Sequence, residues 1–159
     1  MEECIKDSKS KGKKGLVVLS SKKKIGFLSD PKYLKYKGFE TADTADPSFE
    51  LMYLPFEKSA SKPQFEPHIN EMNRDVPQSG FSLYYTNQCP FTAKYVPLLE
   101  KVAESKDTKF QSIHIDTREK AQNAPSPFTI FSLFHDGKFI THEILSEKKF
   151  EKIIDSVMK

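Results

Sequence analysis

The sequence predicts an α/β (α+β) protein built from two small domains. Apolar runs of strand length alternate with helical patterns along the 159 residues, and a polar stretch with three prolines interrupts them at 57–79. The apolar content of 37% favours two modest cores over one large core. We therefore expect a first domain at 1–56, a linker at 57–79 and a second domain at 80–159.

The first domain is predicted to begin with a strand and a short helix. The continuous apolar run "GLVVLS" at 15–20 is typical of a strand that is buried on both faces of a sheet. A short helix follows in "SDPKYLKYKGF", where Ser29 or Asp30 would cap it. Pro31 stands in its first turn and Gly38 at its end, as helix signals require.

Two further strands are predicted to close the first domain as a hairpin. "FETADTA" and "FELMYLPF" flank the turn residues Asp46 and Pro47. Three strands and one short helix cannot bury a core large enough to offset the ordering of the backbone, and "GLVVLS" would leave an unpaired apolar edge. We expect this edge to allow self-association with a second copy or pairing with a separate chain, or else to leave the segment loose or prone to aggregation.

The second domain is predicted to contain four strands and three helices. The strands are "FSLYYT", "KFQSIHI", "FTIFSLF" and "KFITHEI", and the dipeptide Asp136-Gly137 joins the last two as a hairpin. Helices are expected at 90–105, over "TREKAQNA", and after the capping residue Ser146.

Cys89 is the candidate reactive residue of the second domain. It falls at the cap position of the helix at 90–105, and Pro90 takes the first helical position. The sulfur would therefore lie among unpaired N–H groups at the positive end of the helix dipole, which favours the thiolate form. Pro97 removes one hydrogen bond from the same helix and predicts a kink.

The cysteine, the proline eight positions later and the following "LLEKVA" resemble the active-site helix of the thioredoxin and glutaredoxin fold. The order of elements over 80–159 matches that fold as well. The resemblance implies that Cys89 is the catalytic position and that Pro127 is the cis-proline facing it, with Pro125 as the alternative. It implies contacts with the substrate from Pro90, Phe91, Thr92 and Pro127.

Thr92 departs from the dithiol pattern, because it stands where a resolving cysteine would be. Without a second thiol the local disulfide cycle cannot close. Two interpretations remain for this domain. It is either a binding or structural module in which Cys89 caps a helix, or a stand-alone monothiol redox module.

The run from "GLVVLS" through "KGF" to "FELMYLPF" resembles the C-terminal half of a GNAT superfamily N-acetyltransferase. Joined to the "CPFT" domain, it resembles the YoaP-like acetyltransferases. The resemblance implies transfer of an acetyl group from acetyl-CoA to an amine. The second domain would then bind or position a small-molecule acceptor that carries an amine or a thiol.

Two features of the GNAT pattern differ in this chain. The glycine-rich loop that holds the acetyl-CoA pyrophosphate is absent, and "EECIKD" resembles the tail of the helix that this loop would open. We therefore expect a truncated chain that is inactive alone and binds no acetyl-CoA tightly. Leu34 stands at the usual position of the catalytic tyrosine. Tyr33 and Tyr36 flank it and are the candidate proton donors to CoA, unless they simply pack on the helix.

Composition and charge exclude several other classes of function. The net charge is +3, from 25 basic and 22 acidic residues, which is unlike a dedicated nucleic-acid binder. No apolar run approaches the roughly 20 residues that a membrane helix needs, and no signal peptide is evident. Cys4 and Cys89 lack disulfide or metal spacing, so we expect a cytoplasmic protein without nucleic-acid or membrane partners. No metal site is predicted, because ligand spacing is missing among His68, His114, His135 and His142.

Overall fold

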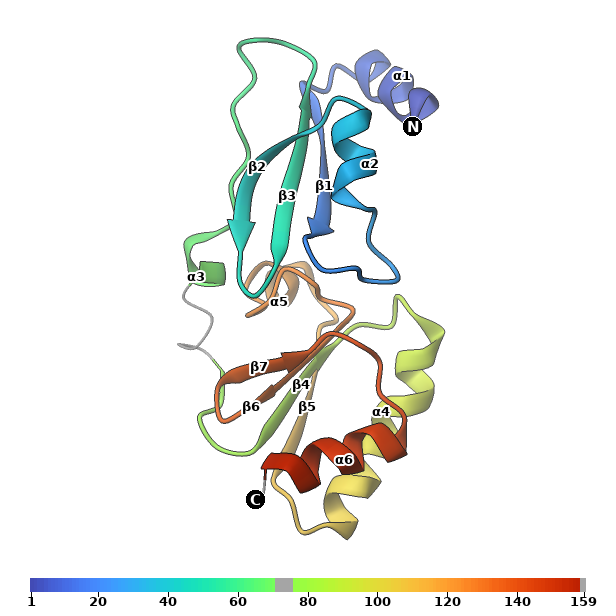
Figure 1. Ribbon diagram of the computed structural model, residues 1–159, viewed down its shortest axis with the longest axis vertical. Helices are drawn as coiled ribbons and strands as arrows, with labels where there is room; N and C mark the ends of the chain where they lie inside the picture. Colours follow the sequence, from blue (N-terminus) through green and yellow to red (C-terminus); the bar gives the residue numbers. More distant parts are fainter. Residues whose placement is uncertain (71–75, 158–159) are drawn as a thin grey trace. The chain divides into compact units, whose positions relative to one another are not determined.

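The chain divides into two compact units, residues 1–70 and 71–159. The structure is a computed structural model that describes residues 1–70 and 76–157 (Figure 1). Helices and strands are mixed in both units, and each unit contains one sheet, which confirms the predicted α/β class. Of the predicted linker, 71–75 lie outside the described residues. The helix α3 (Pro67–Asn70) falls within it, and Val76 is buried.

The first unit is a three-stranded antiparallel sheet with a helix on one face (Figure 1). Its elements are α1 (Glu2–Ser10), β1 (Gly15–Ser21), α2 (Pro31–Tyr36), β2 (Glu40–Ala45), β3 (Phe49–Pro55) and α3. The strand order is β1-β3-β2. The core lies between α2 and the sheet and is formed by Leu34, Phe39 and Met52, with Leu16, Val18 and Leu54 packed against them.

The strand β1 is an edge strand, and it is not buried on both faces as predicted. Val17 is 49% exposed, whereas its neighbours Leu16 and Val18 pack against the core. The reason is that α2 covers one face of the sheet, so alternate residues of β1 point away from the core. Apart from a bridge between Ser20 and Ser29, the outer edge of β1 has no strand partner among the described residues. The predicted unpaired edge is therefore present.

The short helix α2 is defined by the residues at its two ends. Asp30 is its cap, because the Asp30 carboxylate accepts a hydrogen bond from the Lys32 N–H at 2.7 Å. The other candidate, Ser29, instead accepts a hydrogen bond at its carbonyl from the Ser20 hydroxyl at 2.7 Å. Gly38 ends the helix with a φ of +89°, a conformation that glycine adopts at low cost.

The second unit is a four-stranded mixed sheet of order β5-β4-β6-β7. Its elements are β4 (Phe81–Tyr85), α4 (Pro90–Ser105), β5 (Phe110–His114), α5 (Arg118–Gln122), β6 (Phe131–His135), β7 (Lys138–Thr141) and α6 (Glu147–Val157). β4 runs parallel to β5 and antiparallel to β6, and β6 runs antiparallel to β7. The carboxyl ends of β4 and β5, which lead into α4 and α5, therefore lie side by side at the same end of the sheet.

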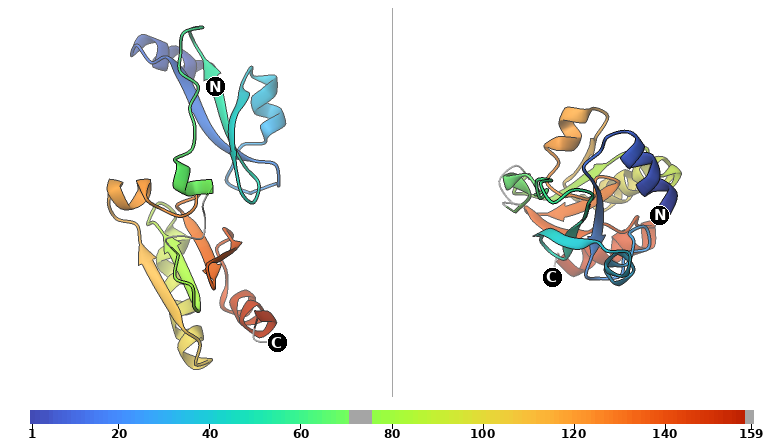
Figure 2. Two further views of the ribbon diagram at one scale, coloured as in Figure 1. Left: turned by 90° about the vertical axis from the view of Figure 1, so that its left-hand side faces the viewer. Right: turned by 90° about the horizontal axis from the view of Figure 1, so that it is seen from above.

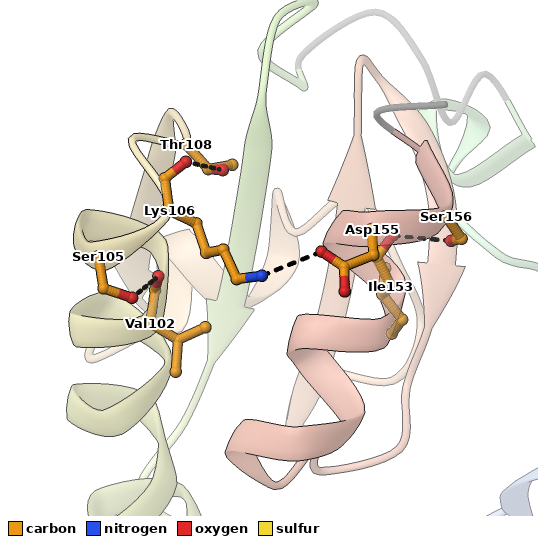
Figure 3. A network of polar contacts seen from close by, with 7 residues as sticks. All are labelled: Val102, Ser105, Lys106, Thr108, Ile153, Asp155 and Ser156. Carbon is orange, nitrogen blue, oxygen red and sulfur yellow. Dashed lines mark hydrogen bonds and ion pairs between the residues drawn. The ribbon is translucent and has the colours of Figure 1, made fainter.

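The helices α4 and α6 pack against each other and cover one face of this sheet (Figures 1 and 2). The core beneath them is fully or nearly fully buried and includes Phe81, Leu83, Val96, Leu99, Leu133, Phe150 and Ile154. At the end of α4, the Lys106 ammonium lies 3.1 Å from the Asp155 carboxylate of α6 (Figure 3). Both partners are exposed, so this ion pair contributes little to stability compared with the apolar core.

The last two strands are shorter than predicted. β6 begins at Phe131, because the residues just before it form a turn. In this turn the Phe128 N–H donates to the Ser126 hydroxyl at 3.3 Å. The Phe128 carbonyl accepts a hydrogen bond from the Ser132 hydroxyl at 2.7 Å. β7 ends at Thr141, whose hydroxyl accepts a hydrogen bond from the Glu143 N–H at 3.0 Å. No helix in the described part of the chain is long and apolar enough to cross a membrane.

Candidate functional site

The structure places Cys89 at the cap position of α4, as the sequence predicts. Cys89 has an extended backbone with φ −112° and ψ 126°, and Pro90 occupies the first turn of the helix. The Cys89 side chain is half-buried and makes no capping hydrogen bond. The thiol therefore lies at the N-terminus of a 16-residue helix, partly accessible to solvent. Cys4 is exposed and lies in the other unit.

Thr92 holds the junction between β4 and α4 together. Its side chain is fully buried, and its hydroxyl lies 2.7 Å from the Thr86 carbonyl and 2.6 Å from the Cys89 carbonyl. The hydroxyl therefore ties the end of the strand to the cap of the helix.

The first turns of α4 also present an aromatic surface. Phe91 is 54% exposed and its ring lies 6.3 Å from that of Tyr95. The Lys94 ammonium lies 5.3 Å from the Tyr95 ring centroid. Pro90 is exposed as well. Phe91 and Pro90 are thus accessible beside Cys89, which is what contact with a ligand requires.

The predicted cis-proline at Pro127 is wrong. Among the described residues the cis peptide bond is Asp46-Pro47, in the first unit, and neither Pro127 nor Pro125 follows a cis bond. Pro127 is half-buried and Pro125 is buried, and both lie in the turn that the Ser126 hydroxyl stabilises through the Phe128 N–H. This local hydrogen bond stabilises the turn before β6 while both X-Pro bonds in it remain trans.

A cleft opens where β4 and β5 end, beside the helix cap. Its lining comes from the residues after β4, from the end of β5 with the start of α5, and from the turn before β6: Thr86, Asn87, Gln88, His114, Ile115, Asp116, Thr117, Arg118, Ala121 and Thr129. The Ile115 N–H donates to the Tyr85 carbonyl at 2.8 Å, which holds the two strand ends together. Sequence reasoning missed this cleft. The available signal was that polar residues directly follow two neighbouring parallel strands, where α/β proteins often bind ligands.

Two pairings fix the electrostatics of this cleft. The Lys120 ammonium lies 2.7 Å from the Asp116 carboxylate, and this hydrogen bond holds the pKa of Asp116 below its usual value. The His114 ring stacks on the Tyr85 ring at 5.0 Å. Arg118 has no ion pair within the described ranges. The negative charge of Asp116 is therefore balanced by Lys120, whereas the positive charge of the Arg118 guanidinium has no ion-pair partner in the described part of the chain.

Tyr33 and Tyr36 lie on the solvent side of α2 in the first unit. They are 47% and 82% exposed, while Leu34 between them is fully buried against the sheet. The Lys37 ammonium lies 6.0 Å from the Tyr33 ring and 5.3 Å from the Tyr36 ring. Both phenols are thus accessible to a reacting group, and packing into the core does not account for them.

Lysines surround a second pocket, in the loop between β1 and α2. Its lining includes Lys22, Lys23, Lys24 and Lys32, with Ile25 and Leu28 as apolar members. Such a pocket attracts anions, although lysines of this kind also serve simply as a solvated surface. No group of three or more His, Cys, Asp or Glu side chains that could hold a metal ion exists among the residues 1–70 and 76–157.

Comparison with known proteins gives two matches. Residues 109–152, from β5 to the first half of α6, match the family model described as YoaP-like. Over 157 residues, the chain is 38% identical to the "Uncharacterized N-acetyltransferase YoaP" of Bacillus subtilis (strain 168). That alignment covers 99% of this chain and 62% of the Bacillus protein, so the chain spans about three fifths of that relative's length. The chain is therefore similar to this N-acetyltransferase over nearly all of its own length, and its residues 109–152 are similar to the YoaP-like family.

Proposed function

We propose that the chain forms part of an acetyl-CoA-dependent N-acetyltransferase. In this proposal residues 1–56 supply the C-terminal half of a GNAT-type domain, and residues 80–159 form a thioredoxin-like domain that binds or positions the acceptor. The observation that carries the proposal is the 38% identity to an N-acetyltransferase homologue across nearly the whole chain.

The architecture of each unit supports the two halves of this proposal. In the first unit a strand, a helix that ends at Gly38 and an antiparallel hairpin follow one another in the order that the GNAT resemblance implies. In the second unit the strand order β5-β4-β6-β7, with α4 and α6 on one face, agrees with a thioredoxin-like fold. Cys89 at the start of α4 agrees with it too.

The exposed tyrosines are the proposed proton donors. In direct transfer the amine nitrogen attacks the acetyl carbon and loses one proton to water, the carbon–sulfur bond breaks, and the CoA thiolate takes up a proton. Tyr33 or Tyr36 would donate that proton, since both phenols are accessible on α2. The sequence holds no glycine-rich pyrophosphate loop, so in this proposal the chain supplies the proton donor and the acceptor-binding domain but not the main acetyl-CoA contacts.

This division of roles can be tested by calorimetry and a CoA-release assay on the chain alone. We expect no micromolar binding of acetyl-CoA and no CoA release with a panel of amines, because the backbone amides that hold the pyrophosphate are missing. Micromolar binding of acetyl-CoA would contradict the proposal that the first unit is half of an acetyltransferase domain.

A second candidate is a monothiol thioredoxin-like module. It is favoured by the accessibility of Cys89 at a helix N-terminus, without a capping hydrogen bond. In a Cys4→Ser background, Cys89 would then react with an alkylating reagent faster than free cysteine at neutral pH. Equal rates for Cys89 and free cysteine would remove the redox version of this candidate.

A further inference from the structure

The cleft at the ends of β4 and β5 has the composition of a binding site for a small anion. Its polar lining comes from segments far apart in the sequence, with Asn87 and Gln88 after β4, Arg118 at the start of α5, and Thr129 before β6. Because β4 and β5 are parallel, the first two segments both follow the carboxyl ends of strands and lie at the same end of the sheet. Ligands bind preferentially at the carboxyl ends of strands in α/β proteins.

Charge compensation within the cleft leaves one cation available. Asp116 is the acidic member of the lining, and Lys120 already neutralises it at 2.7 Å. Arg118 is exposed and has no ion pair in the described part of the chain. An anion that enters the cleft could therefore pair with the Arg118 guanidinium without first displacing a carboxylate of the protein.

The remaining polar groups fit a ligand that both donates and accepts hydrogen bonds. The amides of Asn87 and Gln88 carry donors and acceptors, and the Thr129 hydroxyl does as well. A planar guanidinium matches the two oxygens of a carboxylate with two parallel N–H donors. A carboxylate flanked by amide or amine groups offers a chemical match to each of these partners.

We propose that this cleft binds the carboxylate of an amino acid or short peptide, with Arg118 as its ion-pair partner and Asn87 and Gln88 as hydrogen-bond partners for the adjacent polar groups. The inference rests on the proposed function in one respect: this ligand would be the acetyl acceptor, since it carries an amine as well as a carboxylate. The carboxylate-binding step itself requires no acetyl-CoA.

The test is a nuclear magnetic resonance titration of the labelled full chain with glycylglycine. Glycylglycine amide, which lacks the carboxylate, and inorganic phosphate serve as comparison probes. We expect millimolar binding of glycylglycine, with shifts confined to residues 86–88, 114–118 and 129. The amide should bind at least about tenfold more weakly, because the charged hydrogen bonds are lost.

Variants separate a specific site from general attraction to a basic surface. Arg118→Gln should weaken glycylglycine binding by about tenfold or more, and Arg118→Lys should weaken it less, because charge is kept and the fork is lost. Lys101→Gln, an exposed lysine on α4, is the matched control and should leave binding unchanged. Equal binding by wild type and Arg118→Gln, or tighter binding of phosphate than of glycylglycine, would overturn the proposal.

The outcome is distinguishable from failure of the proposed function. If glycylglycine binds through Arg118 but a chimera that carries this chain in the Bacillus subtilis relative releases no CoA while the relative does, the carboxylate site stands and the acetyltransferase role fails. If that chimera transfers acetyl groups to amines but Arg118→Gln leaves glycylglycine binding unchanged, the carboxylate site fails and the acetyltransferase role stands.

Discussion

The hydroxyl of Thr92 lies 2.6 Å from the carbonyl oxygen of Cys89, and it is the contact that joins the helix cap to the buried interior of the second unit. The same hydroxyl lies 2.7 Å from the carbonyl of Thr86, at the end of β4. The position of the candidate thiol is therefore set by a threonine three residues along the helix.

Replacement of Thr92 by valine tests this role. Thr92→Val keeps the shape of the side chain but removes the hydroxyl. The carbonyls of Thr86 and Cys89 then lose their hydrogen bonds to that hydroxyl, so the free energy of unfolding should fall by about 1 to 2 kcal/mol. Thr129→Val is the control, because the Thr129 hydroxyl forms no such bridge to any residue that the structure describes, and its effect should stay within about 0.5 kcal/mol. Urea denaturation measures both, and equal effects of the two variants would contradict the bridging role.

The buried face of α6 should dominate the stability of the second unit. Phe150 is fully buried, and its ring meets those of Phe81 at 5.2 Å and Phe110 at 5.4 Å. Phe150→Ala should lower the free energy of unfolding by about 3 to 5 kcal/mol, because it removes a large apolar side chain and leaves a cavity. Lys152→Ala, on the exposed side of α6, should change it by less than about 0.5 kcal/mol. A small effect of Phe150→Ala in urea denaturation would mean that α6 does not pack as described.

Stability should depend on pH through His142. The ring packs between Phe128, at 5.6 Å, and Phe139, at 6.1 Å, and this burial lowers its pKa from 6.5, while Glu143 acts in the opposite direction. The unfolded chain therefore takes up a proton more readily than the folded chain. The free energy of unfolding should be highest above pH 6.5 and should fall as the pH drops from 6.5 towards the folded-state value.

Urea titrations at several pH values measure this dependence. His142→Asn should flatten the slope in that window, while wild type retains it. An unchanged slope in His142→Asn would assign the pH dependence to other groups and contradict the account of His142.

The free edge of β1 should control association of the first unit. Lysines flank its apolar centre at 13–14 and at 22–24, so two copies repel each other at low salt. We predict that self-association, measured by sedimentation equilibrium, increases with salt. Val17→Lys should reduce it, because the substitution adds charge to the exposed face of the edge strand.

A matched control distinguishes association through the β1 edge from non-specific association through exposed apolar side chains. Phe27 is 71% exposed and lies in the loop outside the sheet. Phe27→Lys should leave self-association unchanged. If both variants reduce association equally, the edge of β1 is not the contact.

Local signals explain which elements could be predicted from the sequence. The bounds of α4 were predicted at 90–105 and are observed there, because Cys89 and Pro90 mark the start and the apolar spacing continues to the end. The start of β6 was misplaced, because the run "FTIFSLF" is apolar throughout and carries no sign of the turn at Phe128. The exposure of Val17 was missed for a similar reason, since an apolar run does not reveal which face a helix will cover.

The candidate site was only partly predictable for a different physical reason. Cys89 and Thr92 lie on one helix, so their spacing alone brings them together. The cleft depends on a parallel pairing between strands separated in sequence, and no local pattern joins Gln88 to Arg118. The cis-proline was assigned to Pro127 from a family resemblance, whereas the described cis bond precedes Pro47.

The most direct test of the acetyltransferase proposal is a chimera of the Bacillus subtilis relative in which this chain replaces the aligned segment. The amine-dependent release of CoA from acetyl-CoA is measured for the chimera and for the intact relative. We expect release by both proteins, and a loss of release when Tyr33 and Tyr36 of the grafted chain are both changed to phenylalanine. A folded chimera that releases no CoA while the relative does, or the absence of release from both proteins, would contradict it.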